Sequence, residues 1–280
     1  MKKIIAFCIV LLLTAPFSVA AAPGDAPELS ADVPVIMYHG ILNGRTGRYF
    51  VSEKQFESDL KALCDEGYTA ITPDMLIDFA EGRKLLPEKP VLITFDDGHY
   101  NNLYYGMPLL EKYGMRAVVN IVGAYSEYST ASGDHSNPNY SHITWWQIEE
   151  TAQSGVIYYG NHSYGMHKFK PRYGIAQLAG ESDSEYEKNL TEDTMRLQEK
   201  LRVLCGYEPA VYAYPFGKYS KTAVKTLVSL GIKITLTCNE GVTTVRFGVP
   251  ESLINMKRIN REGNYSTERL MALIKRKSFR

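Results

Sequence analysis

The chain has 280 residues, of which 45% are hydrophobic and 22% charged, with 31 Lys and Arg residues against 31 Asp and Glu residues. This composition excludes an intrinsically disordered chain, which needs few apolar residues and a large net charge, and a net charge of zero argues against binding nucleic acid through its phosphates. The length suits one large domain or two small ones and is ample for a buried core.

Residues 1–22 have the features of a secretory signal peptide. Lys2 and Lys3 precede an apolar run, 4–17, that is short for a membrane span, and the small residues of 18–22 follow. We therefore expect a secreted or envelope-associated protein without a stable transmembrane segment; an uncleaved anchor helix is the alternative. Cleavage would leave 29 basic and 31 acidic residues, a net charge of −2.

The cysteines that remain after cleavage are Cys64, Cys205 and Cys238. Three cysteines allow at most one disulfide, which excludes a disulfide-dense secreted scaffold. Cys64 and Cys205 fall in amphipathic helical patterns, where a free Cys behaves as a small hydrophobic residue. We expect neither a disulfide-based function nor a thiolate metal site.

Residues 23–32 are interpreted as a linker, and one domain is predicted over 33–275. Short apolar runs in it are rich in β-branched residues and nearly continuous, which is typical of strands buried on both faces of a parallel sheet. Strands are predicted at 34–39, 69–72, 91–96, 117–123, 156–161, 210–214, 232–238 and 256–259. The polar stretch 126–142 is predicted to be a long surface loop.

Helical patterns lie between these strands. Thr144 and Gln147 have the spacing of a capping box, and Gly206 is placed to end the longest helix. Strand–helix units of about 30–40 residues predict an α/β fold, either a β/α barrel or a doubly wound sheet. In both, functional groups lie on loops at the C-terminal ends of strands. Helices are predicted at 52–66, 144–154, 184–205 and 220–230.

Two adjacent carboxylates, Asp96 and Asp97, stand where a buried strand ends, and Gly98 permits a turn that lets both face one cavity. Such a pair suits a metal ligand beside a general base, because a cation relieves their mutual repulsion. The two acids are too close for a glycosidase pair, which is separated by about 5 Å or more. A helix N-cap with a spare acid is the alternative.

Two histidines, His162 and His167, follow the strand at 156–161. On a helix, residues five apart are separated by about 140° and could not share a ligand, whereas on a loop turning at Gly165 both rings can converge on one ion. Each could instead be a hydrogen-bonded structural residue. Two histidines and a carboxylate with open positions are the pattern of a catalytic metal site.

Two other strand ends carry candidate groups. The sequence 214–217, Tyr-Pro-Phe-Gly, forms a rigid turn that is a weak signal alone, and His39 follows the first strand. The remaining histidines are interpreted as surface or loop residues: His99, His135 and His142.

Together these four segments resemble the polysaccharide deacetylase family, the NodB homology domain of carbohydrate esterase family 4, over roughly residues 34–260. The most specific motif is Thr-Phe-Asp-Asp-Gly at 94–98. The resemblance implies a distorted (β/α) barrel of about seven parallel strands. It implies Asp96 as general base and, for the oxyanion, the backbone N–H of Phe216. The metal ligands that it implies are Asp97, His162 and His167.

Three features depart from the commoner family pattern. The spacing from His162 to His167 is one residue longer than usual and matches the branch that de-N-acetylates poly-β-1,6-N-acetylglucosamine. No histidine follows His167 to supply the general acid; in that branch the motif is circularly permuted to the N-terminus, which implies His39. Ala213 replaces the Arg that commonly orients the base, so the resemblance assigns Asp96 no such partner.

The function implied is hydrolysis of N-acetyl groups on an N-acetylglucosamine polymer, with exopolysaccharide favoured over peptidoglycan or chitin. Zn²⁺ is the default metal for two His and one Asp, and Co²⁺, Ni²⁺ or Mn²⁺ are the alternatives. O-acetyl cleavage of the xylan type stays open, as does a glycan-binding protein without turnover, which Ala213 keeps open. A monomer is expected.

The chain has 20 Tyr against 10 Phe and 2 Trp. A Tyr ring can stack on a sugar while its hydroxyl stays hydrated. Residues in or next to the motifs are therefore expected to bind substrate, whereas Tyr104 and Tyr105 are expected to pack within a helix. The expected substrate-binding residues are Tyr100, Tyr164, Tyr214 and Pro215.

Overall fold

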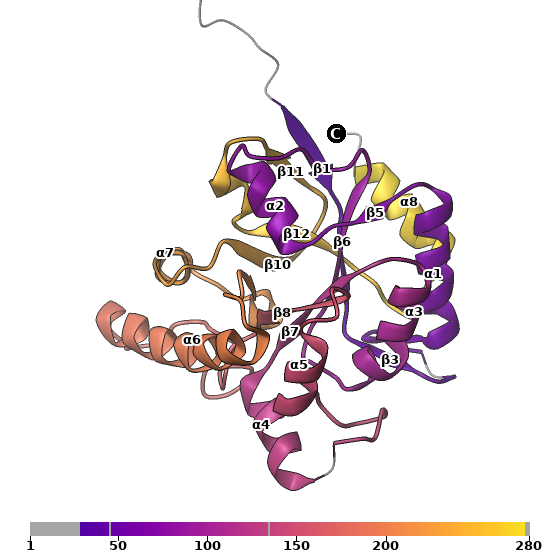
Figure 1. The fold of residues 1–280 in the computed structure, drawn as a ribbon. Coiled ribbons are helices and arrows are strands. Elements are labelled where there is room, and N and C mark those ends of the chain that lie inside the picture. Colours follow the sequence, from indigo (N-terminus) through magenta and orange to yellow (C-terminus); the bar gives the residue numbers. More distant parts are fainter. Residues whose placement is uncertain (1–28, 45, 134, 278–280) are drawn as a thin grey trace, which may run out of the picture.

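The computed structural model describes residues 29–44, 46–133 and 135–277, so the predicted signal peptide lies outside them (Figure 1). Within these residues, seven parallel strands pair in the order β2-β12-β10-β9-β8-β7-β6, and β6 pairs again with β2, which closes a barrel. This confirms the predicted α/β barrel. The strands are β2 (Val35–Tyr38), β6 (Pro90–Phe95), β7 (Ala117–Ile121), β8 (Ile157–Asn161), β9 (Val211–Ala213), β10 (Ile234–Glu240) and β12 (Met256–Asn260).

Short strands outside the ring complete the sheets. The run predicted at 69–72 forms β5 (Thr69–Ala70), which pairs with the start of β6. The sequence did not reveal β3 (Gly40–Leu42) and β4 (Phe50–Ser52), which pair with each other. Residues 30–32, expected in the linker, instead form β1 (Ser30–Val33), which pairs antiparallel with β11 (Thr243–Arg246).

Helices surround the barrel, with α1, α3 and α8 on one side and α6 and α7 on the other (Figure 1). The four predicted helices are present as α1, α5, α6 and α7; Thr144 closes a capping box, and Gly206, at φ 71°, ends α6. Within the described part of the chain, no helix is both long and apolar enough to cross a bilayer. The helices are α1 (Glu53–Asp65), α2 (Pro73–Ala80), α3 (Met107–Lys112), α4 (Gly123–Ser132), α5 (Trp145–Thr151), α6 (Asp183–Cys205), α7 (Lys221–Ser229) and α8 (Thr267–Lys277), with η1 (Asn102–Gly106), η2 (Pro215–Gly217) and η3 (Pro250–Leu253).

The prediction of a surface loop over 126–142 is wrong for its first part, because residues 126–132 belong to α4. This helix has no apolar stripe by which a pattern search could find it. Small polar residues face the protein instead: the hydroxyl of buried Ser129 accepts a hydrogen bond from the backbone N–H of His142, and that of half-buried Thr130 accepts one from the backbone N–H of Trp145.

The alternation of side chains along β6 shows which of them face the barrel interior. Leu92 belongs to an apolar cluster with residues of β2, β7, β9, β10 and β12, so that cluster fills the barrel interior. Val91, Ile93 and Phe95 point the other way, into the larger cluster beneath the helices. Because the strand period is two, Asp96 follows Leu92 and Thr94 on the interior side, at the C-terminal mouth.

Candidate active site

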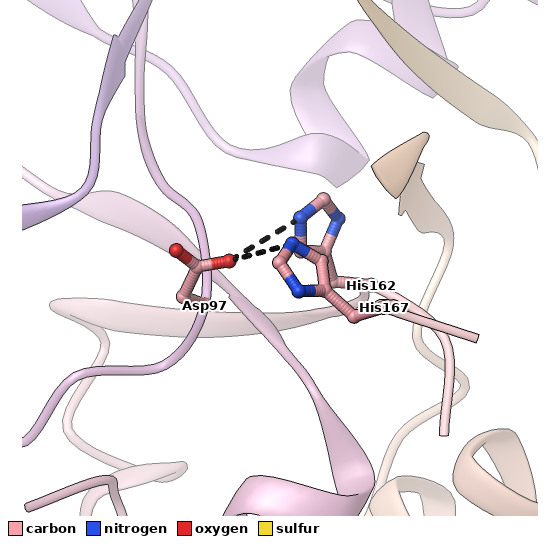
Figure 2. A group of neighbouring side chains, drawn as sticks. All are labelled: Asp97, His162 and His167. Carbon is pink, nitrogen blue, oxygen red and sulfur yellow. Dashed lines mark ion pairs between the residues drawn. The ribbon is translucent and has the colours of Figure 1, made fainter. Parts of the chain in front are cut away.

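Three of the predicted residues meet at this mouth (Figure 2). Asp97 follows β6, while His162 and His167 follow β8, and their ligand atoms all lie within 4.8 Å of one another. The Asp97 Oδ1 atom is 3.2 Å from His167 Nε2 and 3.6 Å from His162 Nε2. Loops at the carboxyl ends of two strands thus bring together the predicted ligands.

The second ring nitrogens are held so that each Nε2 is free for a metal. His162 Nδ1 lies 2.7 Å from the backbone oxygen of Ala213, which can only accept, so this nitrogen carries the proton. His167 Nδ1 contacts the hydroxyl of Tyr125 at 3.0 Å. Among the described residues, buried Asp97 Oδ1 has no hydrogen-bond partner. A buried carboxylate oxygen facing two imidazole nitrogens fits a divalent cation.

The backbone at the site adopts unfavourable conformations. Among the described residues, non-glycine positive φ angles occur at Asp97 (73°), Ser163 (71°), Phe216 (55°) and Asn255 (61°). Each costs on the order of 1–3 kcal/mol and persists only where the surroundings fix it. Gly98 extends the turn after Asp97 at φ 69°, and a Cβ there would lie 2.8 Å from the Ile121 side chain. This turn lets neighbouring Asp96 and Asp97 serve one site.

Asp96 is held by an ion pair that the sequence did not reveal. Arg258 of β12 donates from Nη1 to Oδ1 at 2.9 Å and from Nη2 to Oδ2 at 2.7 Å, and Asn120 Nδ2 donates to Oδ1 at 2.8 Å. The Arg258 side chain is 0% exposed, and its Nε donates to the backbone oxygen of Thr237. The guanidinium that Ala213 lacks therefore reaches Asp96 from another strand. The sequence feature that pointed to Arg258 was a basic residue within a strand predicted to be buried.

The charges at the site set its protonation states. Burial raises the pKa of Asp96, but Arg258 and then His162 outweigh it and hold the pKa well below its usual range. Asp96 is therefore ionised at neutral pH. Burial, followed by the neighbouring His162, lowers the pKa of His167 to about 4, so this ring is neutral at pH 7, as a metal ligand must be.

His39 lies at the same mouth, next to Asp96. The parallel register pairs Tyr38 with Phe95, and the Asp96 backbone N–H donates to the Tyr38 oxygen at 3.0 Å. The His39 ring packs edge-on against Tyr49 at 5.0 Å, and burial lowers its pKa. Its buried Nδ1 has no hydrogen-bond partner among the described residues.

The residues expected to contact substrate lie less openly than the sequence implied. Tyr164 is 9% exposed, with Arg196 3.7 Å above its ring, and Tyr214 is 0% exposed, with its hydroxyl donating to Asn255. These two rings therefore have no open face on which a sugar could stack. Pro215 is also buried, while the half-buried Tyr100 lies 5.8 Å from the exposed Tyr104.

Two histidines interpreted as surface or loop residues lie at the site instead. His99 Nε2 is 3.7 Å from Asp97 Oδ2, and its ring stacks on His142 at 4.9 Å. Tyr125 of α4 packs against His142 at 4.6 Å while its hydroxyl contacts His167. Tyr125 and His142 come from α4 and the loop after it, so the strand-end pattern could not find them, whereas His99 follows the Asp-Asp turn at the end of β6 and was within its reach.

Comparisons with known proteins agree with this geometry. The family described as "Polysaccharide deacetylase" matches residues 83–235. A Bacillus subtilis protein, YxkH, named among the polysaccharide deacetylases, is 30% identical over 217 residues, which cover 78% of this chain and 68% of that protein. The poly-β-1,6-N-acetyl-D-glucosamine N-deacetylase of Escherichia coli K12 is 24% identical over 277 residues, 86% of this chain and only 40% of that enzyme.

A solved structure shares the fold over nearly its whole length. IcaB from Ammonifex degensii aligns with a TM-score of 0.71 at 26% identity, covering 87% of this chain and 97% of IcaB. The Asp-Asp turn and the two histidines lie within the matched residues 83–235, whereas strands β2 and β12 of the barrel lie outside them. With a match that spans more than half of its length, this chain belongs to the polysaccharide deacetylase family.

Proposed function

We propose that this protein is an exported, metal-dependent deacetylase that removes N-acetyl groups from an N-acetylglucosamine-containing polysaccharide. The observation that carries the proposal is the convergence of Asp97, His162 and His167 beside the Arg258-bound carboxylate of Asp96. The substrate named for the Escherichia coli relative, poly-β-1,6-N-acetyl-D-glucosamine, supports exopolysaccharide over peptidoglycan or chitin. Export rests on the signal-like sequence of residues 1–22, and the protein acts as a monomer in this proposal.

The metal would be held by Asp97, His162 and His167, whose one oxygen and two nitrogen donors suit Zn²⁺, with Co²⁺, Ni²⁺ or Mn²⁺ as alternatives. When bound there, a divalent ion polarises the acetyl carbonyl and lowers the pKa of a water molecule. The chain supplies the fixed ring orientations that such a site requires and, at His167, a neutral imidazole.

The other groups carry the proton transfers. Asp96 accepts the proton of the attacking water; Arg258 occupies one lone pair of Oδ2 and leaves another for this task. His39, on the neighbouring strand end, is the general acid: its protonated ring gives a proton to the leaving amine nitrogen as the carbon–nitrogen bond breaks. The backbone N–H of Phe216, in its strained turn, donates to the oxyanion that develops on the carbonyl.

One alternative loses its main support. A glycan-binding protein without turnover was kept open by Ala213, but Arg258 supplies Asp96 with the missing guanidinium at 2.7 and 2.9 Å. O-acetyl ester cleavage of the xylan type needs the same groups and differs only in the substrate. Acetylated xylan is therefore included among the substrates tested.

The experiment measures acetate release from poly-β-1,6-N-acetylglucosamine, peptidoglycan, chitin oligomers and acetylated xylan. Each reaction is run with the untreated protein, with a chelator, and after Zn²⁺ is restored. We expect the fastest release from the β-1,6-linked polymer, its loss with chelator and its return with metal. Binding of the polymer without any metal-dependent acetate release would contradict the proposal and favour the glycan-binding protein.

A further inference from the structure

Three near-parallel aromatic rings lie at the edge of the site. Phe169 and Tyr173 belong to the loop after His167, and Phe216 belongs to η2; we call these three residues the aromatic platform. The Phe216 ring lies 5.0 Å from Tyr173, at 6° between planes, and 4.5 Å from Phe169, at 26°. Phe169 is 69% exposed and Tyr173 is 40% exposed. Exposed, adjacent and aligned rings of this kind mark a binding surface.

The platform is continuous with the proposed metal ligands. The ring of Phe216 lies 4.3 Å from the ring of His167, whose Nε2 faces Asp97. A substrate whose acetyl group reaches the histidines therefore extends over or beside these rings. Among the exposed aromatic residues, Tyr49 also packs at the mouth, but against His39 rather than against a proposed metal ligand.

The loop that carries two of the rings is anchored to the body of the protein. Arg172 forms an ion pair with Glu181, and the two side chains are only 12% and 7% exposed. Gly174 donates its backbone N–H to the oxygen of Lys168 at 2.9 Å, which closes the loop. A Cβ on Gly174 would lie 2.6 Å from the oxygen of Pro215, so the loop packs directly on the turn that presents Phe216. Phe169 and Tyr173 are thus held in place before any ligand binds.

We propose that the aromatic platform binds the pyranose ring next to the residue that is deacetylated, so that Phe169 and Tyr173 set how much more tightly longer chains bind than short ones. The C–H face of a pyranose is flat and apolar and packs on aromatic rings with little ordering of the protein. The proposal rests on the proposed function, since it places the neighbouring sugar relative to the same metal site. It also supplies the stacking surface that the buried Tyr164 and Tyr214 do not.

The test compares Phe169→Ala, Tyr173→Ala and the double variant with the full protein. Substrates are β-1,6-linked N-acetylglucosamine oligomers of increasing length, the free monosaccharide, and 4-nitrophenyl acetate, which reaches the reacting groups without a sugar. We expect KM for the longer oligomers to rise about tenfold in the double variant, with kcat retained, because apolar contact with one sugar ring is lost. Rates on 4-nitrophenyl acetate should be unchanged.

Leu85→Ala is the matched control. Leu85 is an apolar residue that is 62% exposed on the segment leading into β6, at the opposite end of the barrel. Its replacement should change the kinetics neither on the oligomers nor on 4-nitrophenyl acetate. An equal loss on oligomers and on the ester would show that the platform only supports the turn at Phe216, and unchanged oligomer kinetics would overturn the subsite.

Two further readouts separate other outcomes. Lys168 and Lys170 flank Phe169 and are exposed, so co-sedimentation with anionic lipid vesicles is measured in parallel. Vesicle binding that falls in the variants while oligomer kinetics stay unchanged would overturn the sugar subsite in favour of a lipid surface. Absence of acetate release by the unaltered protein would instead contradict the proposed function itself.

Discussion

The two halves of the active site are built differently. Asp96 is fixed from inside the barrel by Arg258 and Asn120, which come from other strands and are buried. His167 lies on a loop, and its position depends on groups from helices, including the hydroxyl of Tyr125. The half proposed to transfer a proton thus shares the rigidity of the barrel, whereas the half proposed to hold the metal lies partly on a loop that can be loosened without unfolding the strands. Changes in the two halves should therefore have separable effects.

The largest effect should come from the adjacent carboxylates. Asp96→Asn should lower kcat by about 10³-fold, since it removes the general base but no metal ligand. Asp97→Asn should abolish activity together with bound metal, because it replaces the charged carboxylate that both histidines face by a neutral amide. Zinc content by mass spectrometry separates the two. An Asp96→Asn protein that also loses its metal would show that both halves act as one unit.

The buried ion pair between Arg258 and Asp96 can be removed and compared with the removal of a second buried ion pair. Arg258→Met leaves Asp96 as a buried unpaired charge and should reduce the free energy of unfolding by about 3–5 kcal/mol. Arg261→Met should do the same to Asp59, because that pair is also fully buried, with a 2.7 Å contact.

Only Arg258→Met should also lower kcat, by about 10²-fold, since the base loses its orientation. Denaturant titration and initial rates of the two variants decide this. Equal activity in both would mean that Arg258 serves stability alone.

The proposed general acid gives the next prediction. His39→Ala should lower kcat by about 10²-fold with zinc content unchanged, since acid catalysis contributes at least that much and His39 is no ligand. Its effect should be far smaller on 4-nitrophenyl acetate, whose leaving group departs without a proton. Full activity of His39→Ala on the polymer would remove the permuted histidine from the proposal.

The sequence predicted the half of the site that follows from strand ends and missed what comes from elsewhere. A buried apolar run predicts where a strand ends. This is how the sequence could reveal Asp96, Asp97, His162 and His167. Arg258 stood out only as a basic residue in a strand predicted to be buried, and its partner could not be identified, because it lies 162 positions away and nothing local marks which buried base pairs with which acid. A pattern search likewise missed α4, whose buried contacts are polar.

The tyrosines show the opposite error. Tyr164 and Tyr214 lie inside motifs, but motif membership does not determine which way a ring turns. Arg196 covers one, and the ring of Tyr219 stacks on the other at 4.5 Å. The exposed rings near the candidate metal ligands are those of Phe169 and Tyr173. They lie in a loop whose sequence carries no motif.

The smallest effect should come from Asp193 of α6, which holds the loop between His162 and His167. Asp193 accepts hydrogen bonds from the backbone N–H groups of Tyr164 at 2.8 Å and Gly165 at 2.7 Å, two residues that lie between the histidines. Asp193→Ala should therefore weaken zinc affinity about tenfold, as loss of groups that orient ligands does, while the free energy of unfolding changes little. Glu192→Gln, at the exposed neighbouring position of the helix, is the control and should alter neither quantity.

Competition with a chromogenic chelator measures the zinc affinity of Asp193→Ala directly. Saturating zinc should restore most of its kcat, because Asp96, Arg258 and the barrel are untouched by the change. Loss of kcat that excess metal does not restore would show that the loop also places the substrate, and the separation between the two halves would then fail at this residue.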